Sequence, residues 1–228
     1  IVETAGRSPE KFMDALKSNG VKVIHKCTSV RHALKAQKIG CDAVSADGFE
    51  CGGHPGEDDI PNYILLPRVA EELSIPFVAS GGIGTGSQLV ASLALGAEGI
   101  NMGTRFLATK EAPVHDNVKQ AIVEASELDT RLIMRNLTNT ERVLKNKAVE
   151  ELVALEKERG DEITFEEVAP FVVSKYKDIM QNGKMDEGAW SCGMVAGLIS
   201  DIPTCKELID RIMGEANDII GKRLAAMM

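Results

Sequence analysis

Residues 75–106 read IPFVASGGIGTGSQLVASLALGAEGINMGTRF, and this stretch decides the fold. Short apolar segments at 75–80 and 98–103 flank a helical pattern at 86–96, which follows a glycine-rich turn. A strand, a helix and a second strand form a βα unit, and repeated βα units build a parallel sheet. In such a sheet the loops that follow the strands meet at one edge, where functional groups gather.

The same alternation runs through the first 108 residues. Further strands are predicted at 1–4, 21–26 and 42–47, and further helices at 8–20, 29–40 and 62–73. Ser8 is expected to cap the first of these helices, with Pro9 in its first turn. The regular crossovers favour a (β/α)8 TIM barrel over a doubly wound sheet. About five strands can be counted against the eight of a complete barrel. We therefore expect an N-terminally truncated barrel whose missing strands would precede Ile1.

The pattern changes at about Thr109. A polar helix is predicted at 111–127, a candidate strand at 130–137, and charged helical sequence with little strand character at 144–182. We expect three parts. They are a TIM-barrel portion with the later strands at 1–108, an inserted, smaller and mostly helical domain at 109–190, and C-terminal barrel helices at 191–228.

Composition restricts the class of partner and the compartment. The chain has 228 residues, of which 44% are hydrophobic, and a net charge of −8, so neither nucleic acid nor membrane insertion is expected. The chain has five cysteines, an odd number, and they are widely spaced. This pattern is typical of free thiols in a reducing cytoplasm and not of a disulfide framework or a metal site. Among them, only Cys51 stands in a loop that suggests a functional role.

Two consecutive predicted strands end in glycine-rich turns, ASGGIGTG at 79–86 and NMGTRF at 101–106. Glycine lets backbone N–H groups approach a phosphate, and the second turn opens into a short helix. Thr104 adds a hydroxyl group. Tight turns alone would not explain both segments, so the pair predicts a phosphate site.

The loop at 51–59 reads CGGHPGEDD and presents a lone histidine. Gly52 and Gly53 would let a planar ring lie against the backbone, with His54 at its edge. A lone histidine is more often structural, but this setting favours a role as general acid or base, or in orienting a substrate. The acids at 57–59 are expected to face solvent or to cap the next helix.

Lys26 ends a predicted strand at the same edge of the sheet. It could stabilise negative charge on a reduced cofactor or a substrate oxyanion, or it could simply reach solvent. Asp47 could position the loop by hydrogen bonding. His25 is expected on the opposite face of its strand with a structural role, and no role is assigned to the remaining two histidines, at 32 and 115.

Three segments carry a family resemblance: DGFECGGHPGEDD at 47–59, ASGGIGTGSQLVASLALGAEGINMGTRFLAT at 79–109 and WSCGMVAGLI at 190–199. They resemble the nitronate monooxygenase (2-nitropropane dioxygenase-like) family of FMN enzymes, and most closely its branch of bacterial NADH:quinone reductases. The resemblance covers essentially the whole chain. It implies a TIM barrel with an inserted helical domain and FMN bound at the strand ends.

The resemblance also implies roles for individual residues. His54 matches the active-site histidine of the family, and the tail after it favours the reductase branch. The family's amino-terminal glycine-rich flavin loop has no counterpart in this chain. The residues implied in FMN binding are Ser80, Gly81, Gly82, Gly103 and Thr104 at the phosphate, Met102 in the pocket wall, Lys26 at the ring or ribityl chain, and Asp47, Gly52 and Gly53 nearby.

Several reactions fit one flavin, because the cofactor carries the chemistry and the pocket selects the partner. The first is oxidation of nitronates or nitroalkanes with O2, in which His54 moves or guides a substrate proton. In the second, NADH reduces the flavin and a quinone takes the electrons. Weaker alternatives are a reductase of enoyl groups on acyl carrier protein and a non-catalytic partial barrel, stable only as a homo-oligomer or with the rest of its chain. A flavin-free nucleotide enzyme like the inosine monophosphate dehydrogenases would need a nucleophilic loop cysteine, which this loop does not provide in the expected setting.

Overall fold

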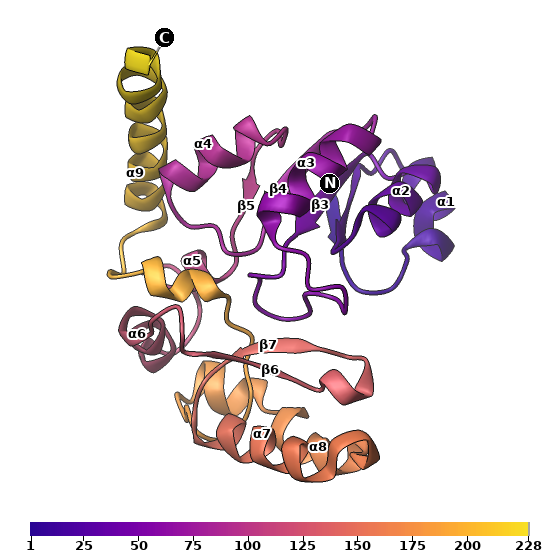
Figure 1. Cartoon of the computed structure of the whole chain (residues 1–228), viewed down its shortest axis with the longest axis vertical. Helices are drawn as coiled ribbons and strands as arrows, with labels where there is room; N and C mark the ends of the chain where they lie inside the picture. Colours follow the sequence, from indigo (N-terminus) through magenta and orange to yellow (C-terminus); the bar gives the residue numbers. More distant parts are fainter. Residues whose placement is uncertain (228) are drawn as a thin grey trace.

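The computed structural model describes residues 1–227, and its first half is built of βα units (Figure 1). Five parallel strands pair in sequence order: β1 (Val2–Thr4), β2 (Val23–Cys27), β3 (Ala43–Asp47), β4 (Phe77–Ser80) and β5 (Ile100–Asn101). The helices between them are α1 (Glu10–Ser18), α2 (Val30–Lys38), α3 (Asn62–Glu72) and α4 (Gly86–Ala94). This sequential order is that of a curled half-barrel, consistent with the expected truncated TIM barrel.

The two faces of the sheet differ in chemistry because side chains alternate along each strand. Val23, Val44 and Phe77 point to the face that the helices cover, and they pack there with Leu65 and Leu66 of α3 in one buried core cluster. Burial of each such side chain contributes about 1.5–3 kcal/mol. The opposite face presents polar residues at the carboxyl ends of the strands.

The start of α1 differs from the prediction. The helix begins at Glu10 and its N-cap is Pro9. The Ser8 hydroxyl caps nothing, and it has no hydrogen-bond partner among residues 1–227.

Beyond the sheet the chain forms a second lobe, at the bottom of Figure 1. It follows the short helix α5 (Thr104–Leu107) and contains α6 (Asp116–Glu124), β6 (Thr130–Ile133), β7 (Glu141–Leu144), α7 (Lys147–Arg159) and α8 (Phe165–Val172). A π-helical turn at Lys177–Gln181 and a 3-10 turn at Met194–Leu198 follow. The prediction of a mostly helical segment missed β7, which pairs with β6 as an antiparallel hairpin. β7 reads ERVL and carries little strand signal of its own, since β-propensity depends strongly on what a strand packs against.

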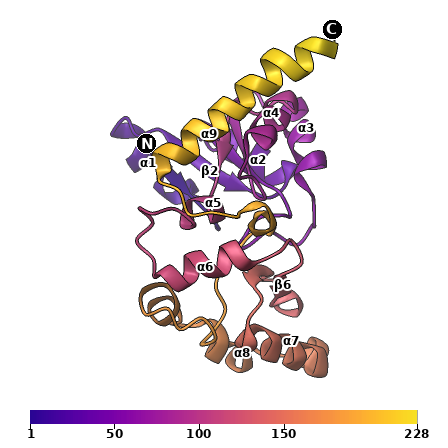
Figure 2. The ribbon, with the colours of Figure 1, turned by 90° about the vertical axis from the view of Figure 1, so that its left-hand side faces the viewer.

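The last long helix, α9 (Cys205–Asp218), returns to the sheet lobe and packs against α4 (Figure 2). Leu208 and Ile212 of α9 lie in one buried cluster with Leu89 and Val90 of α4. A separate core cluster joins Ile122 and Ile179 to Val195, so it crosses the expected boundary at 190. The three-part division of the chain therefore stays a proposal. Within residues 1–227 no helix is long and apolar enough to cross a membrane.

Candidate functional site

Lys26, Asp47 and Ser80 meet at the carboxyl ends of three adjacent strands. The Lys26 ammonium donates to the two Asp47 carboxylate oxygens at 3.3 and 3.2 Å and to the Ser80 hydroxyl oxygen at 3.4 Å. The strand register explains the meeting, because Lys26 pairs with Ser45 and Asp47 pairs with Ser80. Lys26 is therefore held over the concave face instead of extending freely into solvent.

Three residues that were not predicted from the sequence, Asn101, Glu3 and Ser45, extend this network. The Asn101 amide donates to Glu3 Oε1 at 2.8 Å and to the Ser45 hydroxyl at 3.4 Å. Glu3 also lies 3.7 Å from the Lys26 ammonium. Asn101 could have been found from the sequence, because it is the first residue of the NMGTRF turn that the sequence singles out; in the sheet it pairs with Ser80.

A cavity of about 320 Å³ opens beside these groups. Of the predicted site residues, it is lined by Lys26, Asp47, Gly52, Ser80, Gly81, Gly82, Met102, Gly103 and Thr104. Thr104 is the first residue of α5, and N–H groups in the first turn of a helix have no partner within that helix. The residues predicted to form a phosphate site from two separate turns thus line one cavity.

The glycines of the site serve different purposes. A Cβ on Gly82 would lie 2.6 Å from the Glu50 Cβ, and its φ of +72° already disfavours other residues. A Cβ on Gly52 would lie 2.6 Å from the Gly193 nitrogen, so Gly52 admits a neighbouring chain segment; the sequence argument had assigned this space to a flat ligand. A Cβ on Gly103 would meet nothing within 4 Å. Gly103 lines the cavity, and a side chain at this position would enter space that no protein atom occupies.

Asn62, at the start of α3, fixes the first glycine turn. Its amide nitrogen donates to the carbonyl oxygens of Ser80 at 2.8 Å and Gly81 at 2.6 Å. Its backbone N–H in turn donates to the Glu50 carboxylate at 3.1 Å. Sequence reasoning missed Asn62, because the contact joins residues 18 positions apart.

The Thr104 hydroxyl oxygen accepts the Gly193 N–H at 2.9 Å. A hydroxyl that accepts one hydrogen bond can still donate its own proton, so Thr104 retains a donor for an anion in the cavity. The contact also ties residues 191–194 to the site, and the Met194 N–H donates to the Glu50 carbonyl at 3.0 Å.

His54 is exposed and lines a second cavity, of about 540 Å³, that shares Lys26, Asp47 and Gly52 with the first. Its loop is held by β7, because Gly53 and Arg142 exchange two backbone hydrogen bonds of 3.0 and 2.6 Å. Gly53 itself lines neither cavity. The hairpin that the sequence did not predict thus positions the histidine loop.

Arg142 strengthens this attachment with its side chain. Its guanidinium lies 4.5 Å from the centre of the Phe49 ring and donates to the Phe49 carbonyl oxygen at 2.9 Å. Burial lowers the pKa of this guanidinium. The contact joins the second lobe to the segment immediately before the histidine loop.

The acids at 57–59 are exposed, as expected from the sequence, but none of them is the N-cap of α3, and each is paired with another segment. Glu57 accepts hydrogen bonds from the backbone N–H and the hydroxyl of Thr140, at 2.8 and 2.5 Å. Asp59 pairs with Arg135 at 3.1 Å, and Asp58 pairs with the Arg31 guanidinium at 2.8 Å. The acids fasten the loop to α2 on one side and to the second lobe on the other.

The buried cysteines are poor nucleophiles. Burial raises the pKa of the Cys51 thiol to about 12, and that of Cys27 and Cys192 also to about 12. Only the thiolate form of cysteine is a good nucleophile. Cys51 lies in the histidine loop, but its raised pKa keeps it as the unreactive thiol. Among residues 1–227 no group of three or more histidine, cysteine or acidic side chains could hold a metal ion.

The other histidines have simple surroundings. His25 is buried, its Nδ1 lies 2.8 Å from the Thr4 hydroxyl oxygen, and burial lowers its pKa, in keeping with the structural role expected from the sequence. His115 is the N-cap of α6 and accepts the Asn117 N–H at 3.1 Å. His32 is exposed on α2 and lines the second cavity.

Fold and site together define a class: an α/β protein with a half-barrel of βα units and two cavities that share lining residues at the carboxyl ends of its strands. The sequence profile of the family described as nitronate monooxygenase matches residues 1–215. The chain therefore belongs to the nitronate monooxygenase family of oxidoreductases.

Relatives and solved structures agree with this membership. A CoA-thioester dehydrogenase of Rhodococcus jostii, named (3aS,4S,5R,7aS)-5-hydroxy-7a-methyl-1-oxo-octahydro-1H-indene-4-carboxyl-CoA dehydrogenase, is 32% identical over 91% of this chain and 68% of its own length. The structure of FabK from Thermotoga maritima has a TM-score of 0.91 and 33% identity over 100% of this chain and 70% of that one. Nitroalkane oxidase from Streptomyces ansochromogenes has a TM-score of 0.75 and 26% identity, and the match covers 97% of this chain and 65% of that one.

Proposed function

We propose that this chain forms the FMN-binding part of an FMN-dependent oxidoreductase. The observation that carries the proposal is the 320 Å³ cavity at the ends of β4 and β5, joined to the cavity of His54 through Lys26, Asp47 and Gly52. A phosphate needs hydrogen-bond donors and free space, and the start of α5, the Thr104 hydroxyl and the open side of Gly103 supply both. The residues present therefore fit the phosphate end of FMN.

Each part of the site has a distinct task in this proposal. Lys26 supplies positive charge at the flavin side, held in place by Asp47 and Ser80. Such fixed charge stabilises negative charge that develops during a reaction. Bound FMN would supply the electron acceptor. The residues proposed to hold it are Ser80, Gly81, Gly82, Gly103 and Thr104 at the phosphate, Met102 in the wall, and Lys26, Asp47 and Gly52 towards the ring. Gly53, which lines neither cavity, would act only through its backbone pairing with Arg142.

The first candidate reaction is oxidation of a nitroalkane or nitronate with O2. The carbon next to a nitro group is acidic, and an imidazole is the side chain best suited to move its proton near neutral pH. His54 lines the cavity, and its loop is fastened on both sides, so it would accept or guide that proton. The likeness to nitroalkane oxidase supports this reaction.

The second candidate is a reductase, in which NADH reduces the flavin and a quinone or an enoyl thioester takes the electrons. The specific observation in its favour is the size of the His54 cavity, about 540 Å³, which exceeds the needs of a small nitroalkane. The likeness to FabK and to a CoA-thioester dehydrogenase also supports it. His54 would then orient the substrate instead of taking a proton from carbon.

Two half-reactions separate these candidates. The complete protein loaded with FMN is kept anaerobic, and flavin absorbance is followed after addition of NADH or of a nitronate. Rapid bleaching by NADH alone would establish the reductase, and reaction with the nitronate alone would establish the oxidase. A His54→Gln variant should lose most of the nitroalkane rate, because glutamine cannot take the proton. Absence of retained flavin would refute the proposal in both forms.

A further inference from the structure

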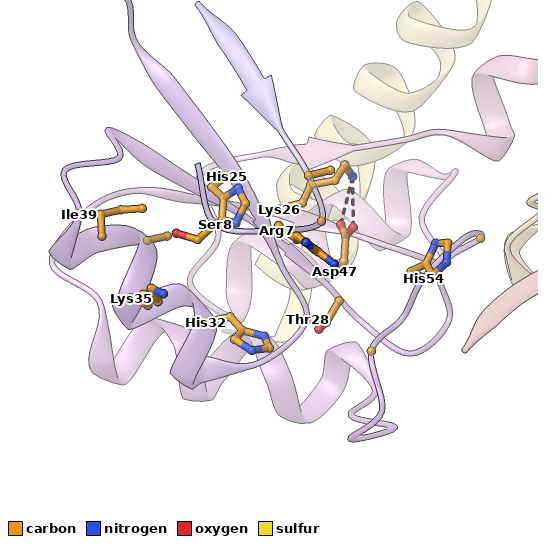
Figure 3. Close-up of a pocket in the computed structure, with 15 residues that line it drawn as sticks. Arg7, Ser8, His25, Lys26, Thr28, His32, Lys35, Ile39, Asp47 and His54 are labelled. Carbon is orange, nitrogen blue, oxygen red and sulfur yellow. Dashed lines mark hydrogen bonds and ion pairs between the residues drawn. The ribbon is translucent and has the colours of Figure 1, made fainter. Parts of the chain in front are cut away.

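The His54 cavity has an arm to which the candidate reactions above assign no residue. It leads away from the flavin residues, along β2 and α2, beneath the loop between β1 and α1 (Figure 3). Figure 3 shows His54 at one end, Asp47, Lys26 and Arg7 in the middle, and Lys35 and Ile39 at the other end. We call this part the α2 arm; its lining residues are Arg7, Ser8, His32, Lys35, Ala36 and Ile39.

The α2 arm carries a surplus of positive charge on a chain whose net charge is −8. Within residues 1–227 Arg7 has no ion pair within 4 Å, and Lys35 has only a contact of 3.8 Å with Glu10. The one carboxylate among the residues that line the cavity is Asp47, which is already paired with Lys26. A cavity lined by cations on an acidic protein concentrates anions.

The polar and apolar groups of the arm are arranged in sequence along it. Ser8 lines the arm, and its hydroxyl oxygen is buried and has no hydrogen-bond partner among the described residues. His32 and Lys35 follow on one side of α2, and Ala36 and Ile39 give an apolar end. A ligand that fits would therefore carry negative charge in its middle and a flat or apolar group at the end furthest from His54.

We propose that the α2 arm binds the adenosine diphosphate moiety of a co-substrate whose reactive end lies at His54. The pyrophosphate lies among Arg7, His32 and Lys35, and the adenine lies towards Ala36 and Ile39. Two sources share this chemistry: a nicotinamide dinucleotide and a CoA thioester. The inference rests on the proposed function, since it places the reactive end beside the flavin residues.

Direct binding tests the arm without any turnover. ADP and adenosine are titrated calorimetrically into the complete, FMN-loaded protein and into the double variant Arg7→Ala/Lys35→Ala. The matched control is Lys11→Ala/Lys38→Ala, which removes the same charge from exposed residues that do not line the cavity. Thermal unfolding verifies that both double variants fold.

The first double variant should bind ADP at least about tenfold more weakly, since a hydrogen bond to a charged group contributes enough for such a change. The ADP affinity of the control variant should stay within about twofold of that of the original protein, because the control removes no cation that lines the cavity. Adenosine affinity should change little in either variant. Equal loss of ADP affinity in both variants would overturn the proposal, because it would indicate general electrostatic attraction. Unchanged affinity in the first variant would overturn it as well.

Displacement of ADP then identifies the source. NADH and CoA are each tested for displacement of ADP. The compound that displaces it, with an affinity that depends on Arg7 and Lys35, is the ligand of the α2 arm. Failure of both to displace ADP would overturn the assignment. The flavin absorbance of the same samples is a separate readout: protein that binds no FMN refutes the proposed function, whereas the heat of ADP binding reports on the α2 arm alone.

Discussion

Replacement of Gly103 by valine should abolish tight FMN binding while it leaves the fold intact. A Cβ at this position meets no protein atom within 4 Å, and the backbone, with φ −95° and ψ −73°, suits residues other than glycine. The added side chain therefore costs the protein little, and because Gly103 lines the cavity we expect the side chain to compete with the phosphate for space. Gly82→Val is different, because its positive φ and the 2.6 Å approach to Glu50 should damage the fold as well.

The expected loss follows from the contacts removed. A hydrogen bond to a charged group contributes about 1.5–3 kcal/mol, so displacement of the phosphate from two donors costs at least about 3 kcal/mol. That energy corresponds to a loss of affinity of roughly 100-fold or more. The free energy of unfolding without FMN should change by less than about 1 kcal/mol, because no buried contact is disturbed.

Quenching of flavin fluorescence measures the FMN affinity, and urea denaturation of the FMN-free protein measures stability. Gly214→Val is the matched control, since a Cβ there also meets nothing within 4 Å but lies on α9, outside both cavities. The control should bind FMN normally. The reasoning fails if Gly103→Val binds FMN within about threefold of the original affinity, or if it loses stability as Gly82→Val does.

Three further predictions test the supports of the site. Asn62→Leu removes the side-chain donor to the Ser80 and Gly81 carbonyls, of which Ser80 keeps the Gly48 N–H, so urea denaturation should show a loss of about 1–3 kcal/mol, and an unchanged midpoint would refute the contact. At pH 8 iodoacetamide should label the half-exposed Cys205 well before Cys51, whose pKa is about 12; rapid labelling of Cys51 in folded protein would contradict its burial. Hydrogen bonds from Lys17 and Val23 lower the pKa of Asp42 below its unfolded value near 3.9, so its stabilisation is complete above that pH and is lost as the pH falls through the folded pKa. The difference in Tm between the original protein and Asp42→Asn should therefore be constant from pH 6 to pH 5 and should shrink below about pH 4; a difference independent of pH would contradict it.

The sequence predicted the strands, which follow from the local order of apolar and helical segments. It also predicted that site residues gather where the carboxyl ends of parallel strands lie side by side. Strands predicted at 42–47 and 75–80 appear as β3 and β4 with small shifts at their ends, because apolar runs between helices define them. The meeting of Lys26, Asp47 and Ser80 follows from the same rule, since the ends of consecutive parallel strands lie side by side.

Contacts between distant segments could not be read from the sequence. Glu57 is exposed as expected, but its hydrogen bonds from Thr140 join residues 83 positions apart and leave no local signal. The strand character of β7 comes from its pairing with β6 and with Gly53, and not from the residues ERVL themselves. From the sequence, the space beside Gly52 is predicted to hold a ligand. In the structure the backbone of Gly193 lies there, and the sequence carries no local signal of that contact.

The comparison of FMN with riboflavin tests the central claim most directly. The two flavins differ only in the phosphate, which is the group that the ends of β4 and β5 are proposed to hold. If they hold it, fluorescence titration of the complete protein should give a Kd for FMN at least about 100-fold lower than that for riboflavin. Equal affinities would contradict the account, because the cavity lined by Gly81, Gly82, Gly103 and Thr104 would then not be a phosphate site.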